Sequence, residues 1–354
     1  MYYLLNEEFE FVTPIENYNS MIWTNRFYSA GDFEMVIPAT IENVAMYKDD
    51  FYIVRDDDYT QCMIIDTIQL NTDNEAGDTL TISGKSLKSI LNRRIIWGSS
   101  TIQVNVNGTF ENCIRQLITD NMIKALHEPS YRNVPGLSLG DVINVTDAMQ
   151  KQYNGENLET AVSEACAEYK IGYDVLLDID KKKFKFVLIK GVDRSYNQSE
   201  NPWVIFSNDF ENLKSTNYIF TNVNYKNAAY VAGEGEGTER KWTVEHDKLA
   251  GLKRREMLVD SKNTSSKSNT TMTAAQYTEL LSEEGKKSIS EATKTEAVEG
   301  DIIVNHTWVY GKDYFLGDTV EVINEYGKSL QPQIIEVIES DSENGKEIVL
   351  TFAT

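Results

Sequence analysis

Histidines and carboxylates are the residues of this chain best suited to catalysis or metal binding, and their spacing indicates no site. The three histidines are His127, His246 and His306. None has a cysteine or a second histidine at ligand spacing, so we expect no metal site. The 55 acidic residues include many pairs that could flank a glycosidic bond, but no pattern selects one pair as the carboxylates of a hydrolase.

The cysteines and serines also lack a catalytic context. Cys62, Cys113 and Cys166 are odd in number and lie far apart in the chain. No pair has metal-ligand spacing, and no Gly-x-Ser-x-Gly motif is present. We therefore expect three buried free thiols in a reducing compartment.

One glycine-rich segment superficially resembles a phosphate loop. Gly233, Gly235 and Gly237 alternate with Glu234 and Glu236. Two carboxylates would repel a phosphate, and no helix follows whose N-terminus could bind one. We expect the tip of a hairpin instead. Its glycines would permit a close backbone approach, such as a tight subunit contact.

A β-hairpin is predicted at residues 22–38, the most distinctive part of the chain. The turn is Ser29 to Asp32, and the second strand alternates Phe33, Met35 and Ile37 with Glu34 and Val36. Trp23 and Arg26 lie three positions apart on the first strand and therefore face opposite sides. We expect a structural or subunit-contact role for both rather than ligand binding.

The remaining elements are mostly short strands. Helices are predicted at about 87–91, 109–124 (capped by Thr109), 158–169 (capped by Asn157 and ended by Gly172) and from a capping box at Thr273 to about 296. Residues 261–271 are polar and predict an exposed loop. Strands are expected at 2–12, broken by a turn, and at 51–55, 61–70, 79–83, 173–179, 184–189, 217–233, 240–246, 302–310, 319–323, 333–338 and 347–352.

The charge and composition limit the possible partners. The net charge is −21, which argues against direct nucleic-acid binding because phosphate contacts need clustered Lys and Arg. The acidity could serve solubility, or it could line a channel that repels DNA and lets it slide. No apolar run is long enough for a membrane helix. The acidic start MYYLLNEEFEF is unlike a signal peptide, so we expect synthesis in the cytoplasm.

Three motifs resemble the tail-hub (baseplate-hub) proteins of tailed bacteriophages. They are WTNRFYSAGDFE at residues 23–34, GDTLTISGKSLKSILNRRII at 77–96 and YFLGDTVEV at 314–322. The Gly-Glu turn followed by Arg240 also recurs in that family. The similarity is to siphovirus-type tail proteins and to the N-terminal, non-catalytic part of tail-associated lysins. It assigns structural or subunit contacts to Trp23, Arg26, Gly31, Phe33, Glu34, Gly84, Arg93, Arg94, Gly233, Gly235, Gly237, Arg240, Gly317 and Asp318.

The resemblance implies a mainly β fold with helices. It predicts two antiparallel, tail-tube-like β-barrels and a smaller α/β insertion. Residues 1–97, with 205–232, would form the first barrel. Residues 98–204, with two helices, and residues 300–354 would form the second. Residues 233–299 would be the insertion.

The resemblance also implies a structural function without cofactors. Three copies would form a ring in the virion, at the tail tip, after assembly in the host cytoplasm. The ring would join a distal tail or tail-tube protein to a spike, fibre or lysin protein, and double-stranded DNA would pass without specific binding. No membrane insertion is expected. Because the chain stops at Thr354, soon after the last strand, the family's lytic part is expected to be absent. A cell-wall hydrolase and a carbohydrate-binding receptor module are the alternatives.

Overall fold

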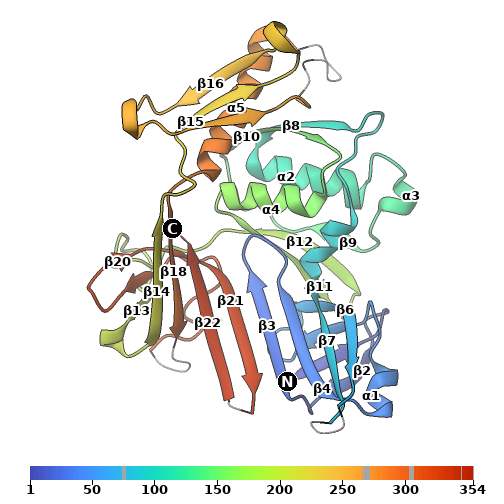
Figure 1. The fold of residues 1–354 in the computed structure, drawn as a ribbon. Helices are drawn as coiled ribbons and strands as arrows, with labels where there is room; N and C mark the ends of the chain where they lie inside the picture. Colours follow the sequence, from blue (N-terminus) through green and yellow to red (C-terminus); the bar gives the residue numbers. More distant parts are fainter. Residues whose placement is uncertain (74–76, 265, 267–271, 303–306, 344, 354) are drawn as a thin grey trace.

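The computed structural model describes residues 1–354 except 74–76, 265, 267–271, 303–306, 344 and 354 (Figure 1). The described chain is mainly β-structure arranged in several sheets. Most helices lie in the middle of the chain and in a small unit at the top of Figure 1, and one short helix lies beside the N-terminal strands. No helix among the described residues is both long and apolar enough to cross a membrane.

One sheet contains strands from both ends of the chain. All its neighbouring strands are antiparallel. In spatial order they are β14 (Leu213–Thr221), β18 (Thr295–Ile302), β22 (Gly345–Ala353), β21 (Gln333–Ser342), β3 (Ser20–Arg26), β4 (Asp32–Pro38), β7 (Thr79–Ser86), β6 (Cys62–Asn71), β5 (Tyr52–Arg55), β1 (Tyr2–Leu5) and β2 (Phe11–Ile15). The short helix α1 (Ile41–Met46) follows β4.

The hairpin predicted at residues 22–38 is confirmed as β3 and β4. Trp23 pairs with Phe33 and Met21 with Met35, so their side chains share one face of the sheet. That face is buried, while Glu34 on the opposite face is exposed. The period-two alternation in the sequence therefore predicted the correct buried face.

The middle of the chain forms a unit of helices and short sheets. A two-stranded sheet pairs β8 (Gln103–Thr109) with β10 (Ala148–Asn154), and a three-stranded sheet has the order β11 (Gly172–Asp178), β12 (Lys183–Ile189), β9 (Leu137–Leu139). The helical segments are the 3-10 turn η1 (Leu87–Arg93), α2 (Phe110–Ile118) with a π turn (Thr119–Ile123), α3 (Pro129–Arg132) and α4 (Leu158–Glu168).

The remaining strands form two small sheets. One pairs β19 (Glu321–Ile323) with β13 (Ile205–Ser207) and β20 (Ser329–Leu330). The other has the order β16 (Trp242–His246), β15 (Ala228–Ala232), β17 (Glu256–Asp260), with α5 (Ala274–Glu291) packed on one face. This last unit lies far from the N-terminal strands (Figure 1).

Four apolar cores correspond to these parts. The N-terminal strands enclose the core that contains Trp23 and Phe33. The middle unit has the largest core, built around α2 and α4. The C-terminal strands share a core with Phe206 and Tyr314, and α5 covers the smallest one through Tyr277 and Leu281. Burial of apolar surface in such cores is the main favourable term in folding.

The predicted helix caps are confirmed, with one correction at a C-terminus. Thr109, Asn157 and Thr273 accept hydrogen bonds from the backbone at the starts of α2, α4 and α5, and Thr273 forms a capping box with Gln276. Gly172 does not end α4. The left-handed residue that stops the helix is Lys170, at φ 54°, and Gly172 begins β11.

Two strand predictions were wrong. Residues 217–233 do not form one long strand: β14 and β15 belong to different sheets. The strand expected at 302–310 instead runs from Thr295 to Ile302, and α5 ends at Glu291 rather than near 296. Hydrogen bonding to β14 and β22 decides the position of β18, which local propensity cannot reveal. Residues 303–306 and most of the loop predicted at 261–271 lie outside the described residues.

Candidate functional site: the joint between the two ends of the chain

The ends of the chain meet where β3 hydrogen-bonds to β21. In this antiparallel register Trp23 lies opposite Glu339 and Arg26 lies opposite Glu336. Figure 1 shows blue β3 beside red β21 at this joint. Because the register fixes both pairs, each face of the joint combines a motif residue with a C-terminal carboxylate.

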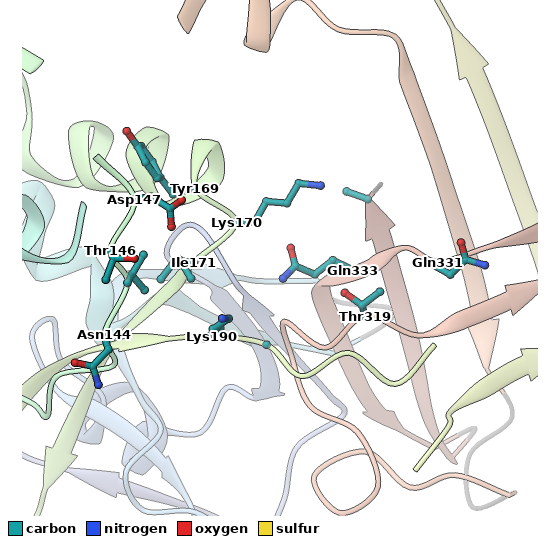
Figure 2. A pocket seen from close by; sticks show the side chains of 13 residues that line it. Asn144, Thr146, Asp147, Tyr169, Lys170, Ile171, Lys190, Thr319, Gln331 and Gln333 are labelled. Carbon is teal, nitrogen blue, oxygen red and sulfur yellow. The ribbon is translucent and has the colours of Figure 1, made fainter. Parts of the chain in front are cut away.

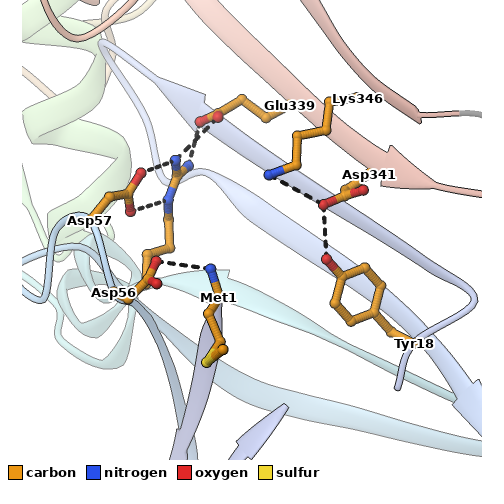
Figure 3. Close-up of polar contacts among 8 residues, drawn as sticks. Met1, Tyr18, Asp56, Asp57, Glu339, Asp341 and Lys346 are labelled. Carbon is orange, nitrogen blue, oxygen red and sulfur yellow. Dashed lines mark hydrogen bonds and ion pairs between the residues drawn. The ribbon is translucent and has the colours of Figure 1, made fainter. Parts of the chain in front are cut away.

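Arg55 crosses the joint on the face that holds Trp23. Its guanidinium pairs with Asp57 at 2.7 Å and with Glu339 (Figure 3). It also lies 5.7 Å from the centroid of the fully buried Trp23 ring. Burial disfavours the charge of Arg55, but hydrogen bonds to Asp57 and Glu339 outweigh burial and raise its pKa. The hydrogen bond from Arg55 lowers the pKa of Asp57.

Further polar contacts on this face join the same two ends. Tyr18 donates a hydrogen bond of 2.8 Å to Asp341 on β21, and Lys346 on β22 lies 3.5 Å from the same carboxylate (Figure 3). Within the N-terminal part itself, the amino group of Met1 pairs with Asp56 at 2.8 Å. These contacts bring charged groups of both signs together where the two ends of the chain meet.

Arg26 connects the strands on the opposite face. Its Nε donates to Glu336 at 2.6 Å, and its Nη1 donates to Asp32 at 2.5 Å and to the carbonyl of Ala30 at 3.2 Å. The guanidinium therefore joins β21 to the β3–β4 turn. Arg26 thus contacts carboxylates on the face opposite the one on which Trp23 fills the core.

Phe27, directly after β3, connects three parts of the molecule. Its ring is buried and lies against Gly172 at the start of β11 and Gly317 in the C-terminal segment. A Cβ at either glycine would lie within 2.3 Å of a ring carbon of Phe27. Phe27 NH also donates to the carbonyl of Ile335 at 2.9 Å. Only residues without a side chain allow the ring this position.

Asp318 ties the C-terminal segment to the chain that leaves β12. Its carboxylate is 2% exposed and accepts hydrogen bonds from Val192 NH (2.8 Å), Arg194 Nε (2.7 Å) and Phe315 NH (3.0 Å). A Cβ at the neighbouring Gly191 would lie 1.7 Å from the carbonyl oxygen of Gly317. A buried carboxylate needs such complete pairing, and here the pairing holds two distant segments together.

The glycine-rich turn is an ordered link within the chain. Gly233 packs against α5, because an added Cβ would lie 2.4 Å from the Tyr277 hydroxyl. Arg240 donates to the carbonyls of Ala232 and Gly233 and pairs with Asp260. Hydrogen bonds from Lys241 and Ser266 lower the pKa of Glu234 to about 2.

The remaining glycines of this turn supply backbone freedom. Gly235 and Gly237 have φ of 98° and 56°, in the region that favours glycine. The ionised Glu234 carboxylate beside the turn pairs with Lys241. Its negative charge would repel a phosphate group.

A family profile described as the Siphovirus ReqiPepy6 Gp37-like protein matches residues 1–352. The chain belongs to this family of phage tail proteins. None of the curated protein sequences compared with the chain matches it.

Solved tail proteins share the fold. The tail protein from Neisseria meningitidis MC58 has a TM-score of 0.60 at 14% identity, covering 100% of this chain and 96% of that chain. The prophage MuSo2 43 kDa tail protein from Shewanella oneidensis has a TM-score of 0.57 at 14% identity, with 97% and 95% covered. The prophage tail protein gp18 from Listeria monocytogenes EGD-e has a TM-score of 0.51 at 12% identity, with 99% and 94% covered. At these identities the similarity shows the fold alone.

The other motif residues of this tail protein lie near the joint or on the surface. Cβ atoms at Gly31 and Gly84 would lie 2.0 and 1.8 Å from the carbonyl oxygens of Thr24 and Ile64. Both glycines therefore allow strands to approach closely. Arg93 pairs with Asp50 at 2.8 Å, and both side chains are exposed. Arg94 lines a small cavity with Arg93. Most residues of the N-terminal motif therefore lie around β3 and β4. Arg93 and Arg94 lie away from the joint between β3 and β21.

A polar cavity of about 350 Å³ lies between the middle unit and the C-terminal strands (Figure 2). Asn144, Thr146 and Asp147 line one side, and Thr319 and Gln333 line the other. Asp147 is the one carboxylate among the described residues that line it. A glycosidase site needs two facing carboxylates, so this cavity does not present that chemistry.

The histidines and cysteines do not form a reactive cluster in the described part of the tail protein. No group of three potential metal ligands occurs among the described residues, and His306 lies outside them. The ring centroids of His127 and Trp97 are 5.8 Å apart. His246 accepts a hydrogen bond from Lys248 NH. All three cysteines are free and buried, as predicted, and burial raises the pKa of each thiol.

Sequence reasoning missed Phe27, Gly172 and Arg55. Phe27 stands inside the quoted motif, but its contacts with Gly172 and Gly317 depend on tertiary structure. Gly172 looked like a helix stop, because a glycine after an amphipathic run commonly is one. Arg55 ends an ordinary predicted strand and precedes three aspartates, which indicated a solvated turn. The only indication of its role in the sequence was its position directly before three consecutive aspartates, Asp56 to Asp58.

Proposed function

We propose that this tail protein is a structural hub at the tail tip, which assembles as a trimeric ring. The observation that carries the proposal is the family match across residues 1–352. The residues of the joint hold chain segments together and do not form a reactive pocket, which is consistent with a structural role. Closed cyclic assembly would also cover exposed sheet edges, which otherwise risk aggregation.

This proposal includes two tail-tube-like barrels per chain. The boundary between the two barrels differs from the one expected from the sequence. Strands β13, β14 and β15, from residues 205–232, pair with C-terminal or insertion strands, and none pairs with a described strand of residues 1–97. We therefore assign β13 and β14 to the C-terminal barrel. Residues 98–190 would form a middle unit, and residues 228–291 the projecting insertion.

The ring would connect two tail components of different symmetry. Three copies with two barrels each would present six similar units to a sixfold tail-tube protein and a threefold surface to a spike, fibre or lysin protein. Double-stranded DNA would pass through the lumen without specific binding. The net charge of −21 supports such a lumen if acidic side chains gather on its wall, because they would repel phosphate. A neutral or basic lumen would contradict this part.

The molar mass in solution tests the ring directly. We expect light scattering of the purified chain to give the mass of three copies, about three times 40.3 kDa. Electron-microscope class averages should show a central hole roughly wide enough for a DNA duplex. A chain that stays monomeric both alone and with its tube-end partner would overturn the proposal.

A carbohydrate-binding receptor module is the second candidate, favoured by one observation. The outer face of the β15–β17 sheet exposes Trp242 and Leu258, each at 70%, beside Tyr230 at 39%. Exposed aromatic rings can stack on sugars. Retention on host cell walls that is lost in Trp242→Ala would support this function. Clearing of purified peptidoglycan by the chain would instead favour the hydrolase alternative.

A further inference from the structure

A small cavity near the middle unit collects three arginines. It has a volume of about 310 Å³ and lies between the end of η1 and α3. Arg93, Arg94 and Arg132 line it together with Tyr131. Arg93 and Arg94 come from the second family-like motif, and the joint described above makes no use of either.

Neutral oxygen atoms hold Arg94 and Arg132 in place. Arg94 Nε donates to the carbonyl of Arg132 at 2.9 Å, and its Nη1 donates to the carbonyl of Arg93 at 2.8 Å. Arg132 Nη2 donates to the carbonyl of Ile95 and to Asn121 Oδ1 at 3.1 Å. These acceptors orient both guanidinium groups but leave their charges unneutralised.

Asn121 is itself fixed. Its side chain is buried in the π turn after α2, where Oδ1 also accepts from Trp97 NH at 3.0 Å and Nδ2 donates to the carbonyl of Leu117 at 2.9 Å. π turns of this kind occur frequently at functional sites. The arginine cavity is therefore preorganised, so little side-chain entropy would be lost when an anion binds.

The absence of carboxylate partners is unusual in this chain. Seven of its ten arginines form ion pairs with described carboxylates. Arg94 and Arg132 form none with any described residue. Burial and the charge of Arg94 lower the pKa of Arg132, and the nearby Glu128 carboxylate opposes this effect. No described carboxylate pairs with either of these adjacent cations, although the chain carries a net charge of −21.

We propose that this cavity binds carboxylates of an acidic protein segment. A guanidinium fork matches a carboxylate in a bidentate arrangement. The rim adds Tyr131, 83% exposed, and Ile95, 45% exposed, which is the mixture of arginine, aromatic and aliphatic groups found in protein interfaces. A nucleic acid is a poor occupant, because two or three cations cannot offset the repulsion of so acidic a chain. This inference does not depend on the ring.

A labelled hexaglutamate peptide tests the cavity. We expect saturable binding at low ionic strength by fluorescence anisotropy. The Arg94→Gln/Arg132→Gln double variant should weaken it about tenfold or more, because both charge-assisted contacts with the carboxylates are lost. Arg94→Lys should retain part of the affinity, because it keeps the charge but loses the fork. Thermal unfolding of each variant shows whether it is folded.

Arg255→Gln is the matched control. Arg255 also lacks a described carboxylate partner, but it donates to the carbonyl of Asn222 and lies over the Tyr225 ring, away from the cavity. Its substitution should leave the affinity unchanged. No saturable binding, or equal losses in the control and the double variant, would overturn the proposal. Displacement of the peptide by equimolar inorganic phosphate would also contradict it, because the cavity would then be a small-anion site.

Discussion

Phe27 shows how one side chain can hold three segments of a protein together. Its buried ring lies on Gly172 and Gly317, and its backbone NH bonds to β21. The ring can be this close only because neither glycine carries a Cβ. In a structural protein these contacts determine how the N-terminal strands, the middle unit and the C-terminal strands are oriented.

Gly172→Ala is predicted to destabilise the protein by about 1–3 kcal/mol, the usual cost of overpacking a core. The new Cβ would lie 2.3–2.7 Å from three ring carbons of Phe27, so the ring or β11 must move. Gly172 does not have positive φ, which separates this clash from backbone strain. Chemical denaturation measures the change in the free energy of unfolding.

Gly108→Ala is the control for this prediction. Its added Cβ would lie 3.8 Å from the sulfur of Cys113, an ordinary van der Waals contact, so stability should hardly change. Adding Phe27→Leu to Gly172→Ala should recover part of the loss, because the smaller side chain relieves the clash. Equal stabilities for Gly172→Ala and the wild type would show that the ring can shift freely.

At the scale of elements, the joint between β3 and β21 combines strand pairing with side-chain ion pairs on both faces. Arg26 joins β21 to the β3–β4 turn on one face, and Arg55 joins β5 to β21 on the other. The backbone ladder alone would allow a slip in register, which would move every side chain to the wrong face. The two arginines favour the register in which Glu336 and Glu339 meet them.

A double-mutant cycle between Arg55 and Glu339 is predicted to give a coupling of about 1–2 kcal/mol. The side chains are 18% and 21% exposed, so solvent screens the pair less than it screens a surface pair. Arg55→Met should destabilise the protein partly because Glu339 would be left without its partner. Urea unfolding of the two single variants and the double variant measures the coupling.

The exposed pair of Lys181 and Asp178 provides the comparison. Its side chains are 69% and 42% exposed, so solvent should screen the pair and a Lys181→Met/Asp178→Asn cycle should give a much smaller coupling. Similar couplings in the two cycles would mean that the joint is held by backbone pairing and not by Arg55.

The glycine-rich turn is predicted to lose structure in acid. Hydrogen bonds from Lys241 and Ser266 lower the pKa of Glu234 to about 2 in the folded state, below the ordinary value near 4.5. A lowered pKa stabilises the fold above the unfolded value, and this contribution is lost as pH falls from about 4.5 towards 2. Amide exchange at Ser266, which donates to Glu234, should therefore speed up relative to its intrinsic rate in that range.

Glu234→Gln tests the origin of this pH dependence. The amide can still accept the Ser266 hydrogen bond but carries no charge to pair with Lys241. The protection of Ser266 should be weaker at pH 6 and nearly independent of pH down to 2.5. If the wild type and the variant respond to acid alike, another carboxylate controls the turn.

The sequence predicted local structure well and long-range pairing poorly, for physical reasons. Thr109, Asn157 and Thr273 cap helices through hydrogen bonds to residues two or three positions away, so their role is visible in the sequence. Trp23 and Phe33 alternate with polar positions within one hairpin. By contrast, β21, the second strand that pairs with β3, lies more than 300 residues away. No local pattern in the sequence specifies this pairing.

The same distinction explains the parts of the candidate site that the sequence could and could not indicate. Gly31 and Gly84 stood out only through their places in the family-like motifs, and the close backbone approach that each permits is visible only in the structure. The burial of Asp318 and the cation pair of Arg94 and Arg132 depend on segments brought together by folding. The N-terminal hairpin was therefore predictable as an element, while its function as a joint required the structure.

For the whole molecule, the charge of the chain should control any assembly into a ring. Each copy carries a net charge of −21, so copies repel one another at low ionic strength. The Debye length falls from about 30 Å at 0.01 M salt to about 8 Å at 0.15 M. Added salt should weaken this long-range repulsion while leaving contacts between apolar surfaces intact.

The trimer fraction is therefore predicted to rise as sodium chloride increases from 10 to 300 mM, measured by sedimentation velocity at fixed protein concentration. Monomer stability should be followed by circular dichroism, since a folding change could imitate an assembly change. An interface held mainly by ion pairs would respond in the opposite direction, with the trimer fraction falling as salt rises. In that case the acidic side chains would meet cationic partners between subunits, and the lumen would not hold most of the negative charge.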